Sequence, residues 1–180
     1  EYLKSTPVAL SSNDTLKKNI LAYLGLEKKV APADREALGS LASLGFRINP
    51  NTFHDNLLKL KFLKKNLEGK HMKHLREIKN QIVELDLSNS NFDDIMSELI
   101  SDLPNLKILR LDQTDITDKT LGLLNNSNLE VLNLYNTKVT YKGLNNLTKI
   151  EEAPKTIYAW NTAVSNEDQV RLMALSSSTI

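Results

Sequence analysis

Cysteine is missing from this chain of 180 residues. Its absence excludes disulfide bonds, thiolate metal sites, a catalytic thiol and covalent attachment of haem to this chain. Only 6 glycines are present, and none lies in a phosphate-loop, dinucleotide-binding or G-x-S-x-G pattern. No run approaches the roughly 18 consecutive apolar residues that a membrane span needs. We therefore expect neither an enzyme of these classes nor direct membrane insertion by this chain.

The chain has almost no net charge, because 23 basic and 22 acidic side chains leave a formal net charge of +1. The balance conceals a gradient, since residues 57–80 carry a net charge of +6 and residues 81–180 a net charge of −6. Solvated faces explain this gradient, and a polarised docking surface is the alternative. The basic stretch has few aromatic residues and no nucleic-acid motif, so we expect no nucleic-acid partner.

What the chain does contain is a repeat. Five segments fit the pattern L-x-x-L-x-L-x-x-[T/S]-x-hydrophobic, with spacings of 25, 24, 23 and 25 residues between their starts at 57, 82, 106, 129 and 154. The fit is weakest at Lys65, which takes the Thr position, and at Pro154 and Ala159. The spacing is the period of leucine-rich repeats.

The pattern within each repeat has a physical cause. Alternating leucines at the fourth and sixth positions predict a half-buried strand whose intervening residues face outward. The ninth position carries a hydroxyl suited to local backbone hydrogen bonds, supplied by Ser90, Thr114, Thr137 and Thr162. The returning segments are predicted to be helices, at residues 68–79, 93–103, 118–124, 141–147 and from 165 to about 175.

Strand, short helix and parallel strand make up the right-handed crossover unit. No such unit buries its own apolar face, so neighbouring units must stack. We therefore predict an α/β fold: a right-handed leucine-rich-repeat solenoid, with a parallel β-sheet on the concave face and short helices on the convex face.

The N-terminal region, residues 1–56, lacks the repeat. Residues 13–25 and 35–44 are predicted helices, and residues 46–48 a short strand. We interpret this region as a helical cap over the open end of the solenoid formed by residues 57–180, with both parts in one folding unit.

Several stretches resemble a known family: residues 31–38, 56–60, 133–140 and 157–165, the last of which contains Ile-Tyr-Ala-Trp-Asn-Thr-Ala-Val-Ser. Over about residues 28–170 the chain resembles extracytoplasmic leucine-rich-repeat modules of Bacteroidetes and Planctomycetes. Many of those modules follow a c-type haem domain and membrane-spanning helices. The resemblance implies a periplasmic or cell-envelope location, tethered through sequence outside this chain, and a binding role. It implies no catalytic residue.

The outward strand positions predict a binding surface. Aromatic rings and amides gather in the last two repeats, where they suit a peptide, a glycan or a protein. The alternative is that the rings cover the end of the solenoid and pack on the terminal helix. The candidate ligand-binding residues are Tyr135, Tyr158, Trp160, Asn133, Asn136, Asn161, Arg110 and Asp112.

Charged groups on the first repeats have a structural interpretation. Lys59 beside Glu84, and Asp86 between Lys61 and Arg110, predict a self-paired ionic lattice on the sheet. Such exposed pairs contribute only about 0–1 kcal/mol each. We therefore expect this part of the surface to be structural.

Two histidines and the adjacent acid pairs Asp93/Asp94 and Glu151/Glu152 are the remaining candidates for chemistry. His71 and His74 share a face of a predicted helix, but no carboxylate completes an obvious metal site, so we expect surface histidines and no metal. Asp93 and Asp94 suit solvation of a helix N-terminus better than acid–base catalysis.

The sequence thus predicts a non-catalytic module without a cofactor. Its expected partner is a protein or peptide, including another domain of the same full-length chain, bound on the concave sheet face. Two alternatives remain open: a structural docking module for an upstream haem or membrane domain, and binding of envelope glycans at the aromatic end.

Overall fold

The computed structural model describes residues 30–52, 55–124, 128–150, 153–165 and 167–168. Within them the elements follow in the order α2 (Arg35–Leu44), β1 (Phe46–Pro50), β2 (Leu58–Phe62), α3 (Gly69–Glu77), β3 (Ile82–Asp86), α4 (Glu98–Ser101), β4 (Ile108–Arg110), α5 (Asp118–Leu121), β5 (Val131–Asn133), α6 (Tyr141–Leu147) and β6 (Thr156–Tyr158). The predicted helix at 13–25 and most of the one from 165 to 175 lie outside the described residues.

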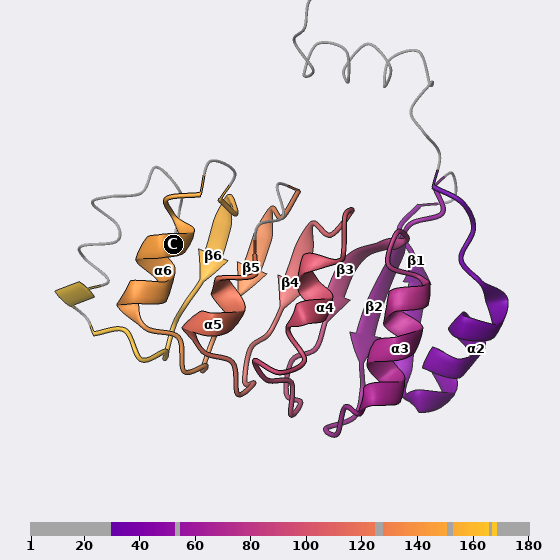
Figure 1. Cartoon of the computed structure of the whole chain (residues 1–180), viewed down its shortest axis with the longest axis horizontal. Helices are drawn as coiled ribbons and strands as arrows, with labels where there is room; N and C mark the ends of the chain where they lie inside the picture. The colour runs from indigo at the N-terminus through magenta and orange to yellow at the C-terminus, as the bar shows by residue number, and fades with distance from the viewer. Residues whose placement is uncertain (1–29, 53–54, 125–127, 151–152, 166, 169–180) are drawn as a thin grey trace, which may run out of the picture.

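The strands form one six-stranded sheet in chain order, β1 to β6. β1 pairs with β2 antiparallel, and every later pair is parallel. Helices α3 to α6 lie along one face of the sheet (Figure 1). The chain is therefore an α/β protein in which a mostly parallel sheet alternates with short helices. Among the described residues no helix lies on the other face of the sheet, which we call the helix-free face.

The fourth position of each repeat lies in the core. Strand pairing aligns these residues across the sheet, and each is at most 2% exposed: Leu60, Leu85, Leu109, Leu132 and Ile157. The sixth and eleventh positions are buried as well, from Phe62 and Leu67 in the first repeat to Ala159 and Val164 in the last. The prediction that the repeated leucines line a shared interior is confirmed.

The ninth position turns the chain as predicted. Each hydroxyl donates a hydrogen bond to the carbonyl three residues earlier, at 2.6 Å for Ser90 and 2.8 Å for Thr137, and Thr114 and Thr162 do the same. The residue just before each hydroxyl adopts the left-handed backbone conformation, with φ between 55° and 58° at Asn89, Gln113, Asn136 and Asn161. The sequence analysis did not anticipate that conformation.

Two returning segments are less helical than predicted. The helix expected at residues 93–103 is reduced to α4, and the one expected at 118–124 ends at Leu121. The Asp93 carboxylate accepts hydrogen bonds from the backbone N–H groups of Ile95 and Met96, a local pattern that competes with helix formation. The helices predicted at 68–79 and 141–147 correspond to α3 and α6.

The N-terminal elements share the core of the repeats. The Asp34 side chain caps α2 by accepting from the Ala37 N–H at 2.8 Å, and Gly45 ends the helix with φ of 110°. Ala37, Leu41 and Phe46 belong to the same buried cluster as the repeat leucines. β1, predicted at 46–48, extends to Pro50 and adds an antiparallel edge to the sheet.

Candidate functional site

The helix-free face of the sheet brings the predicted site residues together. Arg110 on β4, Asn133 on β5 and Tyr158 on β6 are direct neighbours across the sheet. Parallel strands lie about 4.8 Å apart, so side chains in such a row touch. Asp112, Tyr135 and Trp160 follow two residues later on the same three chain segments.

Three aromatic rings are exposed at the C-terminal end of this face. Tyr135, Tyr158 and Trp160 are 42%, 46% and 59% exposed. The Asn136 N–H donates to the Trp160 carbonyl at 2.9 Å, which keeps the segments after β5 and β6 side by side. The rings therefore share one surface, which we call the aromatic patch. The alternative of a covering terminal helix concerns residues outside those described.

The amides of the site hold one another and the chain. Asn133 donates from Nδ2 to Asp112 Oδ1 at 2.9 Å and accepts at Oδ1 from the Tyr135 N–H at 3.0 Å. Asn161 donates to Asn136 Oδ1 at 2.7 Å. Asn133 thus positions Asp112 and the loop that carries Tyr135, whereas its own polar groups are already engaged.

The ionic lattice differs in detail from the prediction. Lys61 pairs with Asp86 at 2.8 Å, as expected. Arg110 lies beside Asp86 across the sheet, but its Nε pairs with Glu84 at 3.4 Å. Lys59 neighbours Glu84 without an ion pair between them in the described structure. The Arg110 side chain is long enough to extend along the strand beyond Asp86 and to reach Glu84. Asp86 already has a cationic partner in Lys61.

The two aspartates near the centre of the face titrate differently. Burial raises the pKa of Asp112, and the neighbouring Asp86 charge raises it further against the opposing charges of Arg110 and Lys61. Burial also raises the pKa of Asp86, but hydrogen bonds from Lys61 and Ser88 outweigh it and hold that pKa below its ordinary value. The face therefore carries one carboxylate whose pKa is lowered and, beside the aromatic patch, one whose pKa is raised.

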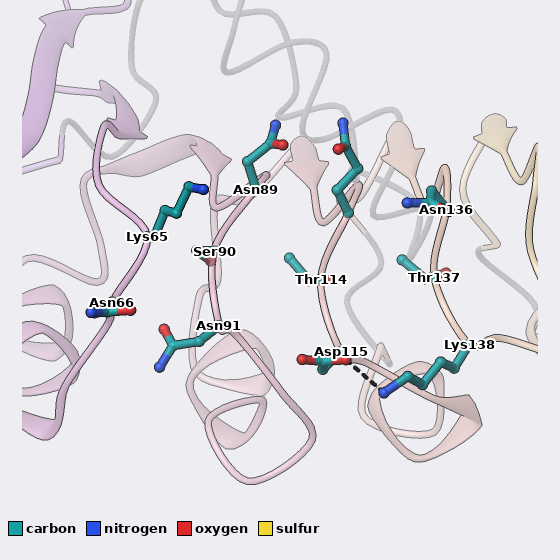
Figure 2. Close-up of a pocket in the computed structure, with 11 residues that line it drawn as sticks. Lys65, Asn66, Asn89, Ser90, Asn91, Thr114, Asp115, Asn136, Thr137 and Lys138 are labelled. Carbon is teal, nitrogen blue, oxygen red and sulfur yellow. Dashed lines mark hydrogen bonds and ion pairs between the residues drawn. The ribbon is translucent and has the colours of Figure 1, made fainter.

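A groove of about 650 Å³ lies at the ends of strands β2 to β5. Figure 2 shows its lining side chains, which stand on the successive loops after these strands. The lining residues are Lys65, Asn66, Asn89, Ser90, Asn91, Gln113, Thr114, Asp115, Asn136, Thr137 and Lys138. Of the predicted site residues only Asn136 lies here. The recurring amide before each hydroxyl was the signal in the sequence that could have identified this groove.

One histidine lies where the sequence analysis did not expect it. His71 is 3% exposed rather than on the surface, with its ring against Phe46 and Phe62. Its Nδ1 accepts from the Glu68 N–H at 2.9 Å, which caps α3. The prediction of a surface His71 is wrong because its face of α3 packs toward the sheet.

His74 lies on the same helix and hydrogen-bonds to Glu77 at 2.7 Å. Across the described ranges, no group of three or more His, Asp or Glu side chains is arranged to hold a metal ion. Nor does any helix in that part of the chain have the length and apolarity to cross a membrane.

Comparison with known proteins adds no family. A scan against protein-family models and a search of curated proteins both returned no match to this chain. The structure therefore defines the class of this chain by its fold alone: it is an α/β protein with a mostly parallel sheet.

Proposed function

We propose that the chain is a leucine-rich-repeat module that recognises a protein or peptide partner without catalysing a reaction. The repeat period of 23 to 25 residues supports this class. So does the stacking of successive strands in chain order, each joined to the next by a returning segment. In a right-handed solenoid of this kind the helix-free face is the concave one, and repeat proteins use such faces for binding.

The aromatic patch is the observation that carries the binding proposal. Tyrosine and tryptophan supply large, rigid contact area at low entropic cost and dominate the energetics of many interfaces. Tyr135, Tyr158 and Trp160 lie on adjoining segments and are each more than 40% exposed. Half-buried Ile108 and Val131 are neighbours on the same face of the sheet.

Peptide selection tests the proposal. Random peptides displayed on phage are selected against the immobilised chain, and enriched peptides are synthesised and titrated by intrinsic Trp fluorescence and calorimetry. We expect enriched peptides to bind the wild type and Trp160→Ala or Tyr158→Ala to weaken binding at least 10-fold, as for hot-spot residues.

The matched control is Ile95→Ala. Ile95 is 85% exposed but lies on the segment before α4, away from the patch. This variant should bind every selected peptide as the wild type does. Enrichment of no peptide, or peptides that bind Trp160→Ala undiminished, would refute recognition at the aromatic patch.

A docking role for the basic region has one observation in its favour. Lys64, Lys73 and Arg76 are exposed and, in the described structure, take part in no ion pair. An acidic partner domain would find there an uncompensated positive surface. The test is association with a separately expressed upstream domain of the same gene product, which should weaken steeply with salt and with Lys73→Glu if this role is correct.

A further inference from the structure

The groove at the strand ends is a surface distinct from the aromatic patch. We propose that it binds a straight, neutral β-1,4-linked glycan through a row of side-chain amides, one from each of three successive repeats. This amide row consists of Asn89, Gln113 and Asn136. It lies along the groove rather than on the sheet face, so the proposal does not depend on peptide recognition.

The amide row is available to a ligand. Asn89, Gln113 and Asn136 are exposed. Within the described residues, the side chains of Asn89 and Gln113 have no hydrogen-bond partner, and the Asn136 carboxamide only accepts, from Asn161. Backbone hydrogen bonds hold the row in place, because the Asn89 N–H donates to the Asp112 carbonyl and the Gln113 N–H to the Tyr135 carbonyl.

The backbone conformation explains only in part why these three positions carry carboxamides. All three residues have positive φ, and Asn is favoured in that region because its short amide can bond locally. Gln has no comparable preference, yet Gln113 adopts φ of 56°. What the three positions share beyond the turn is therefore a carboxamide on a residue that lines the groove.

The spacing and chemistry favour a glycan over a peptide. A carboxamide both donates and accepts hydrogen bonds, and so does each sugar hydroxyl. The amides repeat with the strands, about every 4.8 Å, whereas an extended peptide advances only about 3.3 Å per residue and falls out of step. A β-1,4-linked sugar chain is straight and advances by close to one strand spacing per ring.

The charge of the groove also suits a neutral ligand. Lys138 forms an ion pair with Asp115 at 2.6 Å, which cancels both charges beneath the row. The remaining cation, Lys65, stands on the first loop at one end (Figure 2). The groove covers three strand spacings, about 14 Å, which is enough for three to four sugar rings.

Nuclear magnetic resonance of the ¹⁵N-labelled chain tests this directly, because each side-chain amide of the row gives its own signal. The probes are chitotetraose and cellotetraose, with α-linked maltotetraose and tetra-alanine as comparisons. We expect at least one β-1,4-linked tetrasaccharide to shift the side-chain amide signals of Gln113 and Asn89, and cellobiose to bind more weakly. No shift with either tetrasaccharide at 10 mM probe concentration (about the weakest affinity worth assigning), or a response to tetra-alanine alone, would overturn the proposal.

Glycine variants separate the amide from the turn. Asn89→Gly and Gln113→Gly remove the carboxamide, and glycine accepts positive φ without strain. Each should weaken tetrasaccharide binding about 3- to 10-fold, the effect of one lost hydrogen bond, while Gln113→Asn should retain most of it. Lys119→Ala, on the helix side, is the matched control.

The failure of this proposal is distinguishable from failure of peptide recognition. Trp160→Ala should leave the glycan titration unchanged, and Gln113→Gly should leave the titration of selected peptides unchanged. Unchanged glycan binding in both glycine variants would show that the sugars bind elsewhere and would overturn the assignment to the amide row.

Discussion

The Asp94 carboxylate connects two successive strand–helix units, and its removal tests how such units are held together. It accepts hydrogen bonds from the Thr117 N–H at 2.9 Å, the Thr117 hydroxyl at 2.6 Å and the Thr120 hydroxyl at 2.7 Å. Thr120 is fully buried, at 0% exposed. Asp94→Ala therefore leaves a buried hydroxyl and a backbone N–H of the next unit without their acceptor.

The expected loss follows from these three bonds. A hydrogen bond to a charged group contributes about 1.5–3 kcal/mol, and a buried donor left unsatisfied costs about 1–3 kcal/mol. Asp94 is only half-buried, so water replaces part of what Thr117 loses and the sum must be discounted. We expect Asp94→Ala to lower the free energy of unfolding by about 2–4 kcal/mol.

Urea unfolding followed by circular dichroism measures this loss. With a slope of about 2–3 kcal/mol per molar urea, the midpoint should fall by about 0.7–2 M. Glu98→Ala is the matched control, because Glu98 is an exposed acid of the same returning segment, and it should change stability by less than about 0.5 kcal/mol. A midpoint for Asp94→Ala equal to that of Glu98→Ala at pH 7 would refute the reasoning.

The pH dependence identifies the ionised carboxylate as the source. Partial burial raises the pKa of Asp94, but the hydrogen bonds from Thr117 and Thr120 outweigh it and hold the pKa below its ordinary value of 3.8. A depressed folded-state pKa gives stability that is complete above that ordinary value and is lost as pH falls through the folded pKa. The difference between wild type and Asp94→Ala should therefore be constant from pH 7 to about pH 5 and shrink below about pH 4.

Three further substitutions test the packing and the turns. Gly143→Ala would place a methyl group against the Asp118 carboxylate, which accepts from the Thr140 N–H, so urea unfolding should show a loss of about 1–3 kcal/mol despite the better helix propensity of alanine. Leu109→Ala in the fully buried column should cost about 2–5 kcal/mol by the same assay, and a loss below 1 kcal/mol would contradict its place in the core. Asn89→Ala should cost about 1 kcal/mol more than Asn89→Gly in thermal unfolding, because only glycine accepts φ of 58° freely; equal stabilities would contradict the left-handed turn.

The periodic part of the fold was predictable because one residue type recurs for one reason. Leu85, Leu109 and Leu132 each pack between equivalent neighbours, so a single pattern reports strand position, inward face and register together. The hydroxyls at Ser90 and Thr137 were predictable for the same reason, since each closes a turn with its own backbone. A structural requirement that is local and recurs in every repeat can therefore be recognised as a periodic residue type in the sequence.

Contacts between different positions of neighbouring units are harder to identify from the sequence. The Asp94 carboxylate accepts from Thr117 of the next unit, and the Asp118 carboxylate accepts from Thr140 in the same way, so this contact recurs. The sequence analysis did not pair these residues, because the acids and the threonines each suit a helix N-terminus on their own. His71 looked like a surface residue because lysines surround it in sequence, yet one face of α3 turns it against Phe62. The candidate site shows the same limit, because its residues could be placed on one face but the partner of Arg110 depended on side-chain reach.

The side chains on the outward face of the sheet are not constrained by core packing, as the inward side chains are. On β2 to β4 most charged side chains engage each other, as Lys61 does with Asp86 and Arg110 with Glu84. Tyr158 on β6, and Tyr135 and Trp160 on the segments after β5 and β6, are exposed, and neither turn geometry nor the core formed by the described residues requires rings there. Isolated exposed residues such as Ile95 need no explanation, whereas aromatic rings gathered on adjoining segments are the feature on which the proposed binding surface rests. If the proposed function is correct, the C-terminal end of the sheet is where a partner gains most from binding.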